Sequence, residues 1–520
     1  MNLTFTPIRF KQRAVREYSS KVGIVDGDKR FTYAQYGERC DRLSNALTTL
    51  GVQRGERVAW LGYNSHQLLE AYYGVVQIGA VLLPLNIRLT PQEISYILNN
   101  SETVALFYNK DFAPLVESFK NETTTIRQYI LIEEQYEDLI QTAETNFTPP
   151  DDIKDDDLAE LFYTSGTTAN PKGVMMTHRN LYLHAMQVIG GLGIRDFHTQ
   201  LHTIPLFHVN GWGTPHTLTC MGARHVIVPK FDPSEVLDII QRERVTHVAM
   251  VPTMAYALLN HPKIKEYDLS SLEFINIGGA ASGPSLIREI EQTIGCRAYS
   301  GYGLTETTPV LTLSFIKEHL KDLSDEERWQ RQAMTGFPMP GVEMSIMDGN
   351  DNHLPHDGKS DGEIVVRADN VMAGYWKLPE ETAHLIRDGW FHTGDMAVVD
   401  EEGYYLIVDR KKDIIISGGE NISSIEVEKA IFSNIAVLEC AVIAIPDEHW
   451  GEVPKAIVVL KEGQQLSEQE LIDYCRTQLP GFKVPKSIEF RDTLPKGGTG
   501  KILKKELREV YWKGFEKRVH

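Results

Sequence analysis

The chain reads Thr164-Ser165-Gly166-Thr167-Thr168-Ala169-Asn170-Pro171-Lys172-Gly173 directly after the apolar run Leu161-Phe162-Tyr163. The apolar run is typical of the end of a buried strand, and the segment after it combines glycines, small hydroxyl side chains and one lysine. Glycines let a backbone approach a ligand closely, hydroxyl and N–H groups donate hydrogen bonds, and the lysine adds positive charge. This combination predicts a loop that holds the phosphates of a nucleotide; the alternative is a surface turn. It is not a P-loop, because the pattern G-x-x-x-x-G-K-[ST] does not fit.

The length and composition of the chain narrow the classes of protein to which it can belong. Its 520 residues exceed one ordinary hydrophobic core and predict at least two domains. Hydrophobic residues make up 42% and charged residues 24%, which is typical of a soluble globular protein. The formal net charge of −18 argues against broad nucleic-acid binding, because such binding needs basic patches.

Cysteine usage and the apolar stretches predict a cytoplasmic protein. The five cysteines are scattered without a close pair, which fits neither a disulfide framework nor a zinc site and suits a reducing compartment. The first residues lack the apolar core of a signal peptide. The longest apolar stretch, around residues 75–85, is too short to span a bilayer. Peripheral contact with a membrane stays open.

Buried strands alternate with helical patterns through most of the chain. Strands are expected at residues 57–61, 80–85, 223–229, 247–251 and 272–277, and helices at residues 68–78 and 233–244. This alternation predicts an α/β fold with several layers and largely parallel sheets. The acidic run at residues 151–157 is interpreted as a solvated linker.

The sequence changes character near residue 410. A strand is expected at residues 403–408, and it is followed by a charged cluster, residues 409–413, and by the glycine pair Gly418-Gly419. A charged segment before a glycine pair is interpreted as a hinge. Helices at residues 424–432 and 467–479, with several short strands, are enough for a small α+β domain. We therefore expect a large N-terminal domain, 1–411, and a small mobile C-terminal domain, 412–520, with the hinge at Lys412.

Four further segments place polar or glycine-rich residues where α/β proteins build their sites, at strand ends. They are Pro205-Leu206-Phe207-His208-Val209-Asn210-Gly211-Trp212, Ser300-Gly301-Tyr302-Gly303-Leu304-Thr305-Glu306, Trp390-Phe391-His392-Thr393-Gly394-Asp395 and Pro495-Lys496-Gly497-Gly498-Thr499-Gly500-Lys501. The ring of Tyr302 is expected to stack on a base, Glu306 to bind Mg²⁺, and Asp395 to accept hydrogen bonds from ribose hydroxyls. Plainer interpretations exist: a structural His208, a tight glycine turn, and a solvated Lys501.

In this order, the motifs make the chain resemble the adenylate-forming superfamily of acyl-CoA synthetases, firefly luciferases and nonribosomal adenylation domains. The resemblance extends from about Phe31 to Leu507. Within the superfamily the chain is most similar to the fatty-acyl-CoA synthetases, on the segments Phe207-His208-Val209-Asn210-Gly211-Trp212 and Ser314-Phe315-Ile316-Lys317-Glu318-His319-Leu320.

The resemblance implies a set of residues that bind ATP and the metal ion. The family's phosphate loop usually has glycine where this chain has Ala169, and a methyl group there would restrict the loop if φ is positive. Thr164 and Glu306 are the implied metal contacts. The implied ATP-binding residues are Thr164, Ser165, Gly166, Thr167, Thr168, Lys172, Gly279, Ala280, Ala281, Gly301, Tyr302, Asp395, Arg410 and Lys412.

The resemblance also implies the catalytic, acyl and CoA residues. The implied catalytic residues are Lys501, Glu306, Thr305 and His208. The implied acyl-binding residues are His208, Val209, Asn210 and Trp212. The implied CoA-binding residues are Gly418, Gly419, Arg88, Phe482 and Lys486. Trp212 is expected to gate an acyl tunnel, and the alternative is that it is an ordinary core aromatic.

The implied reaction has two halves and uses ATP, Mg²⁺ and coenzyme A. A carboxylate attacks the α-phosphorus of ATP, giving acyl-AMP and pyrophosphate, and the thiol of coenzyme A then displaces AMP. Because an anion attacks an anion, the barrier is largely electrostatic, and Lys501, Mg²⁺ and the loop donors would stabilise the charge. We therefore expect an AMP-forming fatty-acyl-CoA synthetase for a medium- or long-chain acid.

Several alternatives stay open. The same chemistry could act on an aromatic or short-chain acid. Alternatively, the acyl-AMP could pass to an acceptor other than CoA. A non-catalytic nucleotide sensor is disfavoured because Lys501 and Glu306 are both present. A P-loop kinase or GTPase is disfavoured because Lys501 is followed by Ile502 rather than by Ser or Thr. A homodimer is an expectation that comes only from the fatty-acyl relatives.

Overall fold

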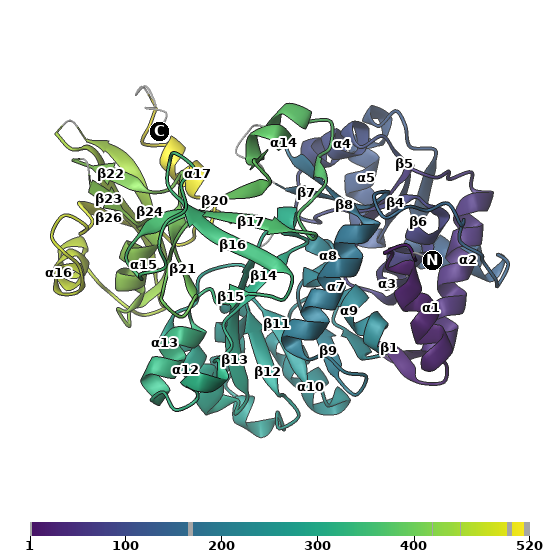
Figure 1. Ribbon diagram of the computed structural model, residues 1–520, viewed down its shortest axis with the longest axis horizontal. Helices are drawn as coiled ribbons and strands as arrows, with labels where there is room; N and C mark the ends of the chain where they lie inside the picture. Colours follow the sequence, from purple (N-terminus) through teal and green to yellow (C-terminus); the bar gives the residue numbers. More distant parts are fainter. Residues whose placement is uncertain (1–2, 165–169, 419, 448, 497–501, 514–520) are drawn as a thin grey trace. The chain divides into compact units, whose positions relative to one another are not determined.

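The computed structural model describes residues 3–164, 170–418, 420–447, 449–496 and 502–513. The chain divides into two compact units, which are described separately (Figure 1). The large unit is Met1–Glu343 with Val366–Phe391, and the small unit is Met344–Val365 with His392–His520. None of the helices in the described ranges has the length and apolar character that crossing a bilayer requires.

Two sheets form the large unit. The first has seven strands in the order β18-β8-β7-β4-β3-β5-β6. Their bounds are β3 Arg57–Leu61, β4 Val81–Pro84, β5 Thr103–Tyr108, β6 Gln128–Leu131, β7 Leu158–Thr164, β8 Lys172–Thr177 and β18 Gly374–Tyr375. Strands β7, β4, β3, β5 and β6 pair in parallel, and β8 and β18 are antiparallel at one edge.

The second sheet has nine strands in the order β15-β14-β13-β12-β11-β9-β10-β1-β2, with a parallel core from β1 to β13. Their bounds are β1 Val22–Asp26, β2 Lys29–Thr32, β9 Thr199–His202, β10 Arg224–Ile227, β11 His247–Met250, β12 Phe274–Ile277, β13 Arg297–Gly303, β14 Val310–Leu313 and β15 Phe337–Pro338. These two largely parallel sheets confirm the predicted α/β class of the large domain.

Helices cover both sheets. They are α1 Ile8–Glu17, α2 Tyr33–Thr49, α3 His66–Gly74, α4 Pro91–Asn100, α5 Ala113–Phe119, α6 Glu137–Gln141, α7 His178–Leu192, α8 Val209–Trp212, α9 Thr214–Met221, α10 Pro233–Glu243, α11 Pro252–Leu259, α12 Pro284–Thr293, α13 Asp325–Gln332 and α14 Pro379–Leu385. Helix α9 contacts both sheets, because His216 reaches Glu160 of β7 and Thr219 reaches His225 of β10. It therefore lies in a layer between them, beside α7 (Figure 1).

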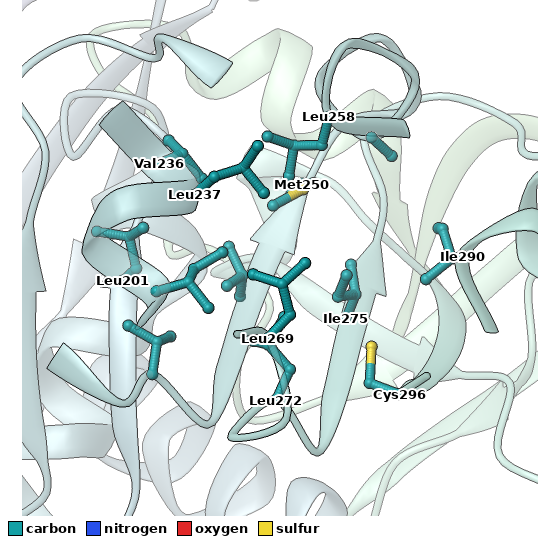
Figure 2. Packing of buried hydrophobic residues seen from close by; sticks show 14 of the residues in the cluster. Leu201, Val236, Leu237, Met250, Leu258, Leu269, Leu272, Ile275, Ile290 and Cys296 are labelled. Atoms are coloured by element: carbon teal, nitrogen blue, oxygen red, sulfur yellow. The ribbon is translucent and has the colours of Figure 1, made fainter. Parts of the chain in front are cut away.

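The two faces of the nine-stranded sheet differ in polarity because successive strand residues point to opposite faces. On one face, Leu201, Met250 and Ile275 pack against helices α10, α11 and α12 in the cluster that Figure 2 shows. The other face carries buried polar side chains. They are Gln200, His202, His225, His247 and Asn276. Helices α7 and α9 lie over this polar face, since Val310 donates its backbone N–H to His184 of α7 and Thr219 of α9 lies 3.2 Å from His225.

The small unit is α+β. Its main sheet has the order β23-β22-β25-β24, with β26 beside β25. The strands are β22 Ile415–Ser417, β23 Glu420–Ile422, β24 Val437–Asp447, β25 Gly451–Leu460 and β26 Ser487–Phe490, and the helices are α15 Ser424–Phe432, α16 Glu468–Gln478 and α17 Lys504–Glu509. A further sheet, β16-β17-β20-β19 with β21 beside β20, contains the points where the chain passes between the units. Its strands are β16 Val342–Met347, β17 Asp361–Ala368, β19 Ile386–Arg387, β20 Trp390–Val399 and β21 Tyr405–Arg410. A small α+β domain was predicted and is confirmed.

Two of the expected elements have bounds that differ for a clear structural reason, and one helix was not expected. The helix expected at residues 68–78 ends at Gly74 and continues as the 3₁₀ turn Val76–Ile78, which Gly79 terminates with φ of 77°. The strand expected at residues 403–408 is β21 Tyr405–Arg410 and includes part of the charged cluster, because Asp395 on β20 pairs with Arg410. Helix α17, a third helix in the C-terminal region, was not predicted.

Candidate active site

The predicted phosphate loop connects two paired strands. Strands β7 and β8 form an antiparallel hairpin in which Thr164 stands directly opposite Lys172. The loop residues Ser165, Gly166, Thr167, Thr168 and Ala169 lie outside the described residues. The hairpin register therefore fixes the two ends of the loop and brings a hydroxyl group and an ammonium group together.

Lys172 and Glu306 both contact a third strand, which the sequence did not point to. Strand β18 pairs with β8, so that Tyr375 lies beside the hairpin. The ammonium of Lys172 lies 5.4 Å from the centre of the Tyr375 ring, and it forms an ion pair with Glu381 of α14. Tyr375 donates its hydroxyl to Glu306 Oε1 at 2.7 Å. Burial, followed by the neighbouring charge of Glu306, raises the pKa of Tyr375, which keeps the hydroxyl protonated as a donor.

Thr305 and Glu306 belong to a short 3₁₀ turn, Thr305–Thr307, that returning chain holds in place. Asn370 donates its side-chain amide to the carbonyl of Thr307 at 2.7 Å, and the N–H of Met372 donates to the carbonyl of Glu306 at 2.8 Å. These two hydrogen bonds hold the backbone from which the Glu306 carboxylate extends.

The candidate adenine residues follow two neighbouring parallel strands. Residues 279–281 come after β12, and Gly301 and Tyr302 are at the end of β13, with Ile277 paired to Ser300. Ala280 and Ala281 are exposed, and Tyr302 is half-buried. Because the carboxyl ends of parallel strands meet at one edge of a sheet, the structure brings these predicted residues together.

The segment from Val209 to Gly213 is a left-handed turn, and it was expected to bind the acyl group. Val209, Asn210, Gly211, Trp212 and Gly213 have φ of 45°, 40°, 54°, 65° and 79°. Positive φ is unfavourable for non-glycine residues and above all for β-branched valine, so the turn stores backbone strain of about 1–3 kcal/mol per residue. Other contacts must therefore hold it.

A buried carboxylate holds this turn. Glu160 of β7 is fully buried and accepts a hydrogen bond from Asn210 Nδ2 at 2.8 Å. Its other oxygen lies 2.7 Å from Nε2 of His216 on α9, and Nδ1 of that ring lies 3.2 Å from the hydroxyl of Tyr73. The sequence gives no sign of this role, because Glu160 and Asn210 are 50 positions apart.

Replacing Glu160 by leucine is therefore expected to lower the free energy of unfolding by about 3 kcal/mol, because two buried donors lose their acceptor at about 1–3 kcal/mol each. Glu160→Gln, which keeps one carbonyl oxygen, should lose about half as much. Urea unfolding of the three proteins measures the effect. A leucine variant as stable as the wild type would contradict the role given to Glu160.

Trp212 lies against the glycines that border the predicted adenine site. A Cβ at Gly278 would lie 2.9 Å from Cη2 of the indole, and one at Gly279 would lie 3.6 Å from Cζ2. The indole is largely buried and packs with Ile204 and Ala249. It also lines a cavity over the polar face of the nine-stranded sheet. Trp212 thus lies against the Gly278-Gly279 segment and also lines the cavity, and its role as a gate stays a prediction.

The small unit contains the remaining predicted nucleotide residues that the structure describes. Asp395 on β20 faces Arg410 on β21 across the sheet, and Arg410 Nε lies 3.3 Å from Asp395 Oδ1. The Asp395 side chain is 6% exposed, whereas that of Arg410 is 44% exposed. Glu363 of β17 accepts from the N–H of Gly394 at 3.0 Å and contacts Lys411 at 3.1 Å. The Asp395 carboxylate is therefore rigidly placed with a cation beside it.

The segment that was predicted to be the hinge contacts helix α17. Lys412 is exposed, but Arg508 of α17 donates to its carbonyl at 3.2 Å and pairs with Asp413 at 3.0 Å. Lys504 at the start of α17 pairs with Glu428 of α15 at 2.7 Å. The predicted catalytic Lys501 lies outside the described residues, and the flanking residues Lys496 and Ile502 form a β-bridge.

The CoA candidates lie at the surface. Arg88 in the large unit and Phe482 and Lys486 in the small unit are exposed. Gly418 has φ of 60°, and a Cβ there would lie 2.6 Å from Cε3 of Trp450, while Gly419 lies outside the described residues. The structure does not gather these residues into one cluster within either unit, and their role stays a prediction.

Comparison with known proteins places the chain in a family. The model described as AMP-binding enzyme matches residues 11–376, and the one described as AMP-binding enzyme C-terminal domain matches residues 426–501. The chain therefore belongs to the adenylate-forming family of AMP-binding enzymes.

Its relatives are named as acid–CoA ligases with different acids. The long-chain-fatty-acid–CoA ligase of Thermus thermophilus is 39% identical over 490 residues, which cover 93% of this chain and 90% of that protein. The feruloyl-CoA synthase of an Amycolatopsis species is 39% identical over 503 residues, which cover 96% and 98%. The crystal structure of the anthranilate CoA ligase AuaEII with anthranoyl-AMP matches with a TM-score of 0.90 at 28% identity, covering 98% of both chains.

Replacing Asp395 by alanine is expected to raise the KM for ATP about 10–100-fold, because hydrogen bonds to a buried charged group are worth about 1.5–3 kcal/mol each. The check is a comparison of ATP with 2′,3′-dideoxy-ATP. The dideoxy analogue should be the poorer substrate for the wild type and equal to ATP for Asp395→Ala. Equal use of both nucleotides by the wild type would contradict the ribose role.

Proposed function

We propose that the chain is an AMP-forming acid–CoA ligase that activates a fatty acid of medium or long chain. The observation that carries the proposal is the cluster of Thr164, Lys172, Tyr375 and Glu306 at one edge of the seven-stranded sheet, in the same unit as a largely apolar cavity that Trp212 lines. The cluster supplies the cation, the hydroxyl and the carboxylate that a triphosphate with its metal ion requires. The family membership and the names of the relatives support the same reaction.

In the first half-reaction we assign the phosphate end of ATP to the hairpin loop. Lys172 is the cation that binds the β- and γ-phosphates. When ATP binds, the phosphates replace Glu381 as the partner of its ammonium group. Tyr302 stacks on the base next to residues 279–281. Asp395 holds the ribose, with Arg410 opposite it across the sheet and Lys412 two residues further along the chain. Lys501 and Thr305 stabilise the charge that spreads over the α-phosphate as the carboxylate attacks.

Glu306 and Thr164 fit a magnesium ion. Within the described residues, Tyr375 contacts Glu306 through Oε1, and carboxylate and hydroxyl oxygens are ligands that Mg²⁺ accepts together with phosphate oxygens. The ion would neutralise charge on the phosphates. The protein's own part is to hold Glu306 in a single orientation through Tyr375 and the backbone of Met372.

In the second half-reaction we assign the coenzyme A thiol as the nucleophile. Gly418 and Gly419 are the candidates for the pantetheine passage, and Arg88, Phe482 and Lys486 for the nucleotide end. We propose domain limits of 1–411 and 412–520, with Lys412 as the hinge that lets the small domain serve both steps.

The lining of the cavity at Trp212 supports an acid with an apolar tail. Seven of its lining residues are apolar aliphatic or methionine side chains, and Phe274 adds a ring. They are Val188, Leu192, Val248, Ala249, Val310, Leu313 and Met339. Transfer of an apolar tail from water into such a space is favourable. Phe274 also favours a second candidate, an aromatic acid, for which a flat ring partner is suited.

The test is pyrophosphate release from ATP, Mg²⁺ and CoA with acids of graded length and with aryl acids. The proposal predicts AMP and acyl-CoA in equal amounts and a best rate with medium- or long-chain acids. A best rate with aryl acids supports the second candidate. The proposal is overturned if no acid gives AMP, or if ADP forms instead.

A further inference from the structure

The acyl cavity has a polar patch that a plain hydrocarbon tail would leave unused. The cavity lies between helix α7 and the polar face of the nine-stranded sheet, and it is lined by Gln200 of β9, His247 of β11 and Asn276 of β12 as well as by Trp212. Residues alternate along β12, so that Asn276 points to the cavity face while Ile275 and Ile277 enter the apolar cluster behind the sheet.

Asn276 is the unusual member of this patch. The residue is 8% exposed, and among the described residues its Oδ1 has no hydrogen-bond partner. Gln200 and His247, by contrast, contact each other, with His247 Nε2 at 3.0 Å from Gln200 Oε1. A buried amide oxygen without a partner is costly, and such groups in folded proteins usually meet a water molecule or a ligand. Because Asn276 also lines the cavity, its amide is a polar group that a molecule entering there can contact.

That group is uncharged. The described residues that line the cavity include no Asp, Glu, Lys or Arg. Burial lowers the pKa of His247 to about 3, so that its ring is neutral at physiological pH. A second carboxylate or an ammonium group on the acid would be buried without a counter-ion, which is strongly unfavourable. A hydroxyl group suits the site, because it both donates and accepts and so satisfies an amide whichever way its oxygen and nitrogen point.

We propose that the preferred acid carries an uncharged hydroxyl group on its tail, which binds Asn276 inside the cavity. This inference rests on the proposed acid activation. It narrows the range of acids to those with a hydroxyl group, whether the carbon skeleton is aliphatic or aromatic. Asn276 precedes Gly278, against which the Trp212 indole lies, by two strand residues, or about 7 Å. The hydroxyl therefore lies beyond the indole, away from the reacting carboxyl group.

The experiment compares matched acids that differ by one hydroxyl. Pairs such as hexanoate and 6-hydroxyhexanoate, octanoate and 8-hydroxyoctanoate, and cinnamate and 4-hydroxycinnamate are assayed for pyrophosphate release. The wild type should prefer the hydroxylated member of at least one pair roughly tenfold or more in kcat/KM, since a site built to bond a hydroxyl rejects the analogue without it. The aliphatic and aromatic pairs distinguish the two frames.

Two variants locate the preference. Asn276→Leu should abolish it, mainly by losing activity with the hydroxylated acid, and Asn276→Ser should retain part of it. Gln187→Leu is the matched control, because Gln187 on α7 is equally buried and its Oε1 also has no partner among the described residues, yet it does not line the cavity. This control should keep the wild-type ratio.

The outcomes separate this inference from the proposed function. If every unsubstituted acid is used as well as its hydroxylated partner by the wild type, the inference is overturned although acid activation stands. The same holds if Asn276→Leu keeps the preference. Absence of pyrophosphate release with all acids would overturn both. The ratio of kcat/KM for the two members of each pair, measured on the wild type, already shows whether a hydroxylated acid is preferred. The test therefore does not depend on the folding of a variant.

Discussion

Replacing Lys501 by alanine is expected to slow acyl-AMP formation about 10²–10³-fold, which corresponds to about 3–4 kcal/mol of lost transition-state stabilisation. The reason is electrostatic. The attacking carboxylate and the α-phosphate are both anions, so a positive charge placed where the negative charge spreads lowers the barrier directly. Thioester formation from presynthesised acyl-AMP should keep its wild-type rate, because in that step the thiol attacks the acyl carbon and no bond to the α-phosphorus forms.

The two half-reactions have to be measured separately. Quench-flow detection of acyl-AMP without CoA reports the first, and CoA consumption with added acyl-AMP reports the second. Lys496→Ala is the matched control, because Lys496 lies on the same glycine-rich segment and forms an ion pair with Glu439. It should leave both rates within about twofold of the wild type, as an exposed ion pair is worth at most about 1 kcal/mol. A Lys501→Ala enzyme that adenylates at full speed contradicts the role assigned to this lysine.

Acid should destabilise the large unit steeply below pH 6.5. Five histidines in it are buried and have lowered pKa values, which desolvation causes first. The pKa is about 3 for His184, His202 and His247, about 4 for His178, and well below the ordinary value for His225. In the unfolded chain these rings take up protons near pH 6.5, so the unfolded state binds more protons as the pH falls.

The sign and size of the effect follow from this difference. The stabilisation is complete above pH 6.5 and is lost progressively as the pH falls from 6.5 towards 3. At pH 5 each such ring lowers the free energy of unfolding by about 2 kcal/mol. Even a few of them therefore remove several kcal/mol from a typical free energy of unfolding of about 5–15 kcal/mol. His216 lies near His184 and His225, and its Nε2 lies 2.7 Å from the carboxylate of Glu160.

Urea unfolding at pH 7.5, 6.5, 5.5 and 5.0 measures this loss. The free energy of unfolding should fall at each step below pH 6.5. A His202→Asn variant should show a shallower slope than the wild type, and His356→Asn, which removes an exposed histidine of the small unit, should not. A free energy that stays constant or rises between pH 6.5 and pH 5 would contradict the neutral, buried state of these rings.

Much of the fold could be predicted because it depends on local patterns. The strand Arg57–Leu61 and the helix Ser424–Phe432 have the predicted bounds, since each is an apolar pattern with clear ends, and Ser423 caps the helix. Helix α17 was missed because it has only six residues, five of them charged, and one buried side chain, Leu507. Its stability comes from Arg508 and Lys504, which bind acidic groups far away in the sequence.

The candidate site was predicted unevenly for the same reason. Thr164, Lys172 and Glu306 stand in glycine-rich or hydroxyl-rich motifs that are visible in the sequence. Tyr375 and Glu381 do not, because their contacts to Glu306 and Lys172 span 69 and 209 positions. The buried Glu160 and Asn276 occur in runs that read as ordinary strands. Only the fold reveals that a polar side chain among apolar neighbours points to a strained turn or into a cavity.

The central claim is that the carboxylate of an acid attacks the α-phosphorus of ATP. An acid labelled with ¹⁸O in its carboxyl group tests this directly when AMP, pyrophosphate and any ADP are analysed by mass spectrometry after one round of turnover. The account predicts one ¹⁸O atom in the phosphate of each AMP released by CoA, and none in pyrophosphate. Label in inorganic phosphate with ADP as the nucleotide product, or unlabelled AMP, would contradict it.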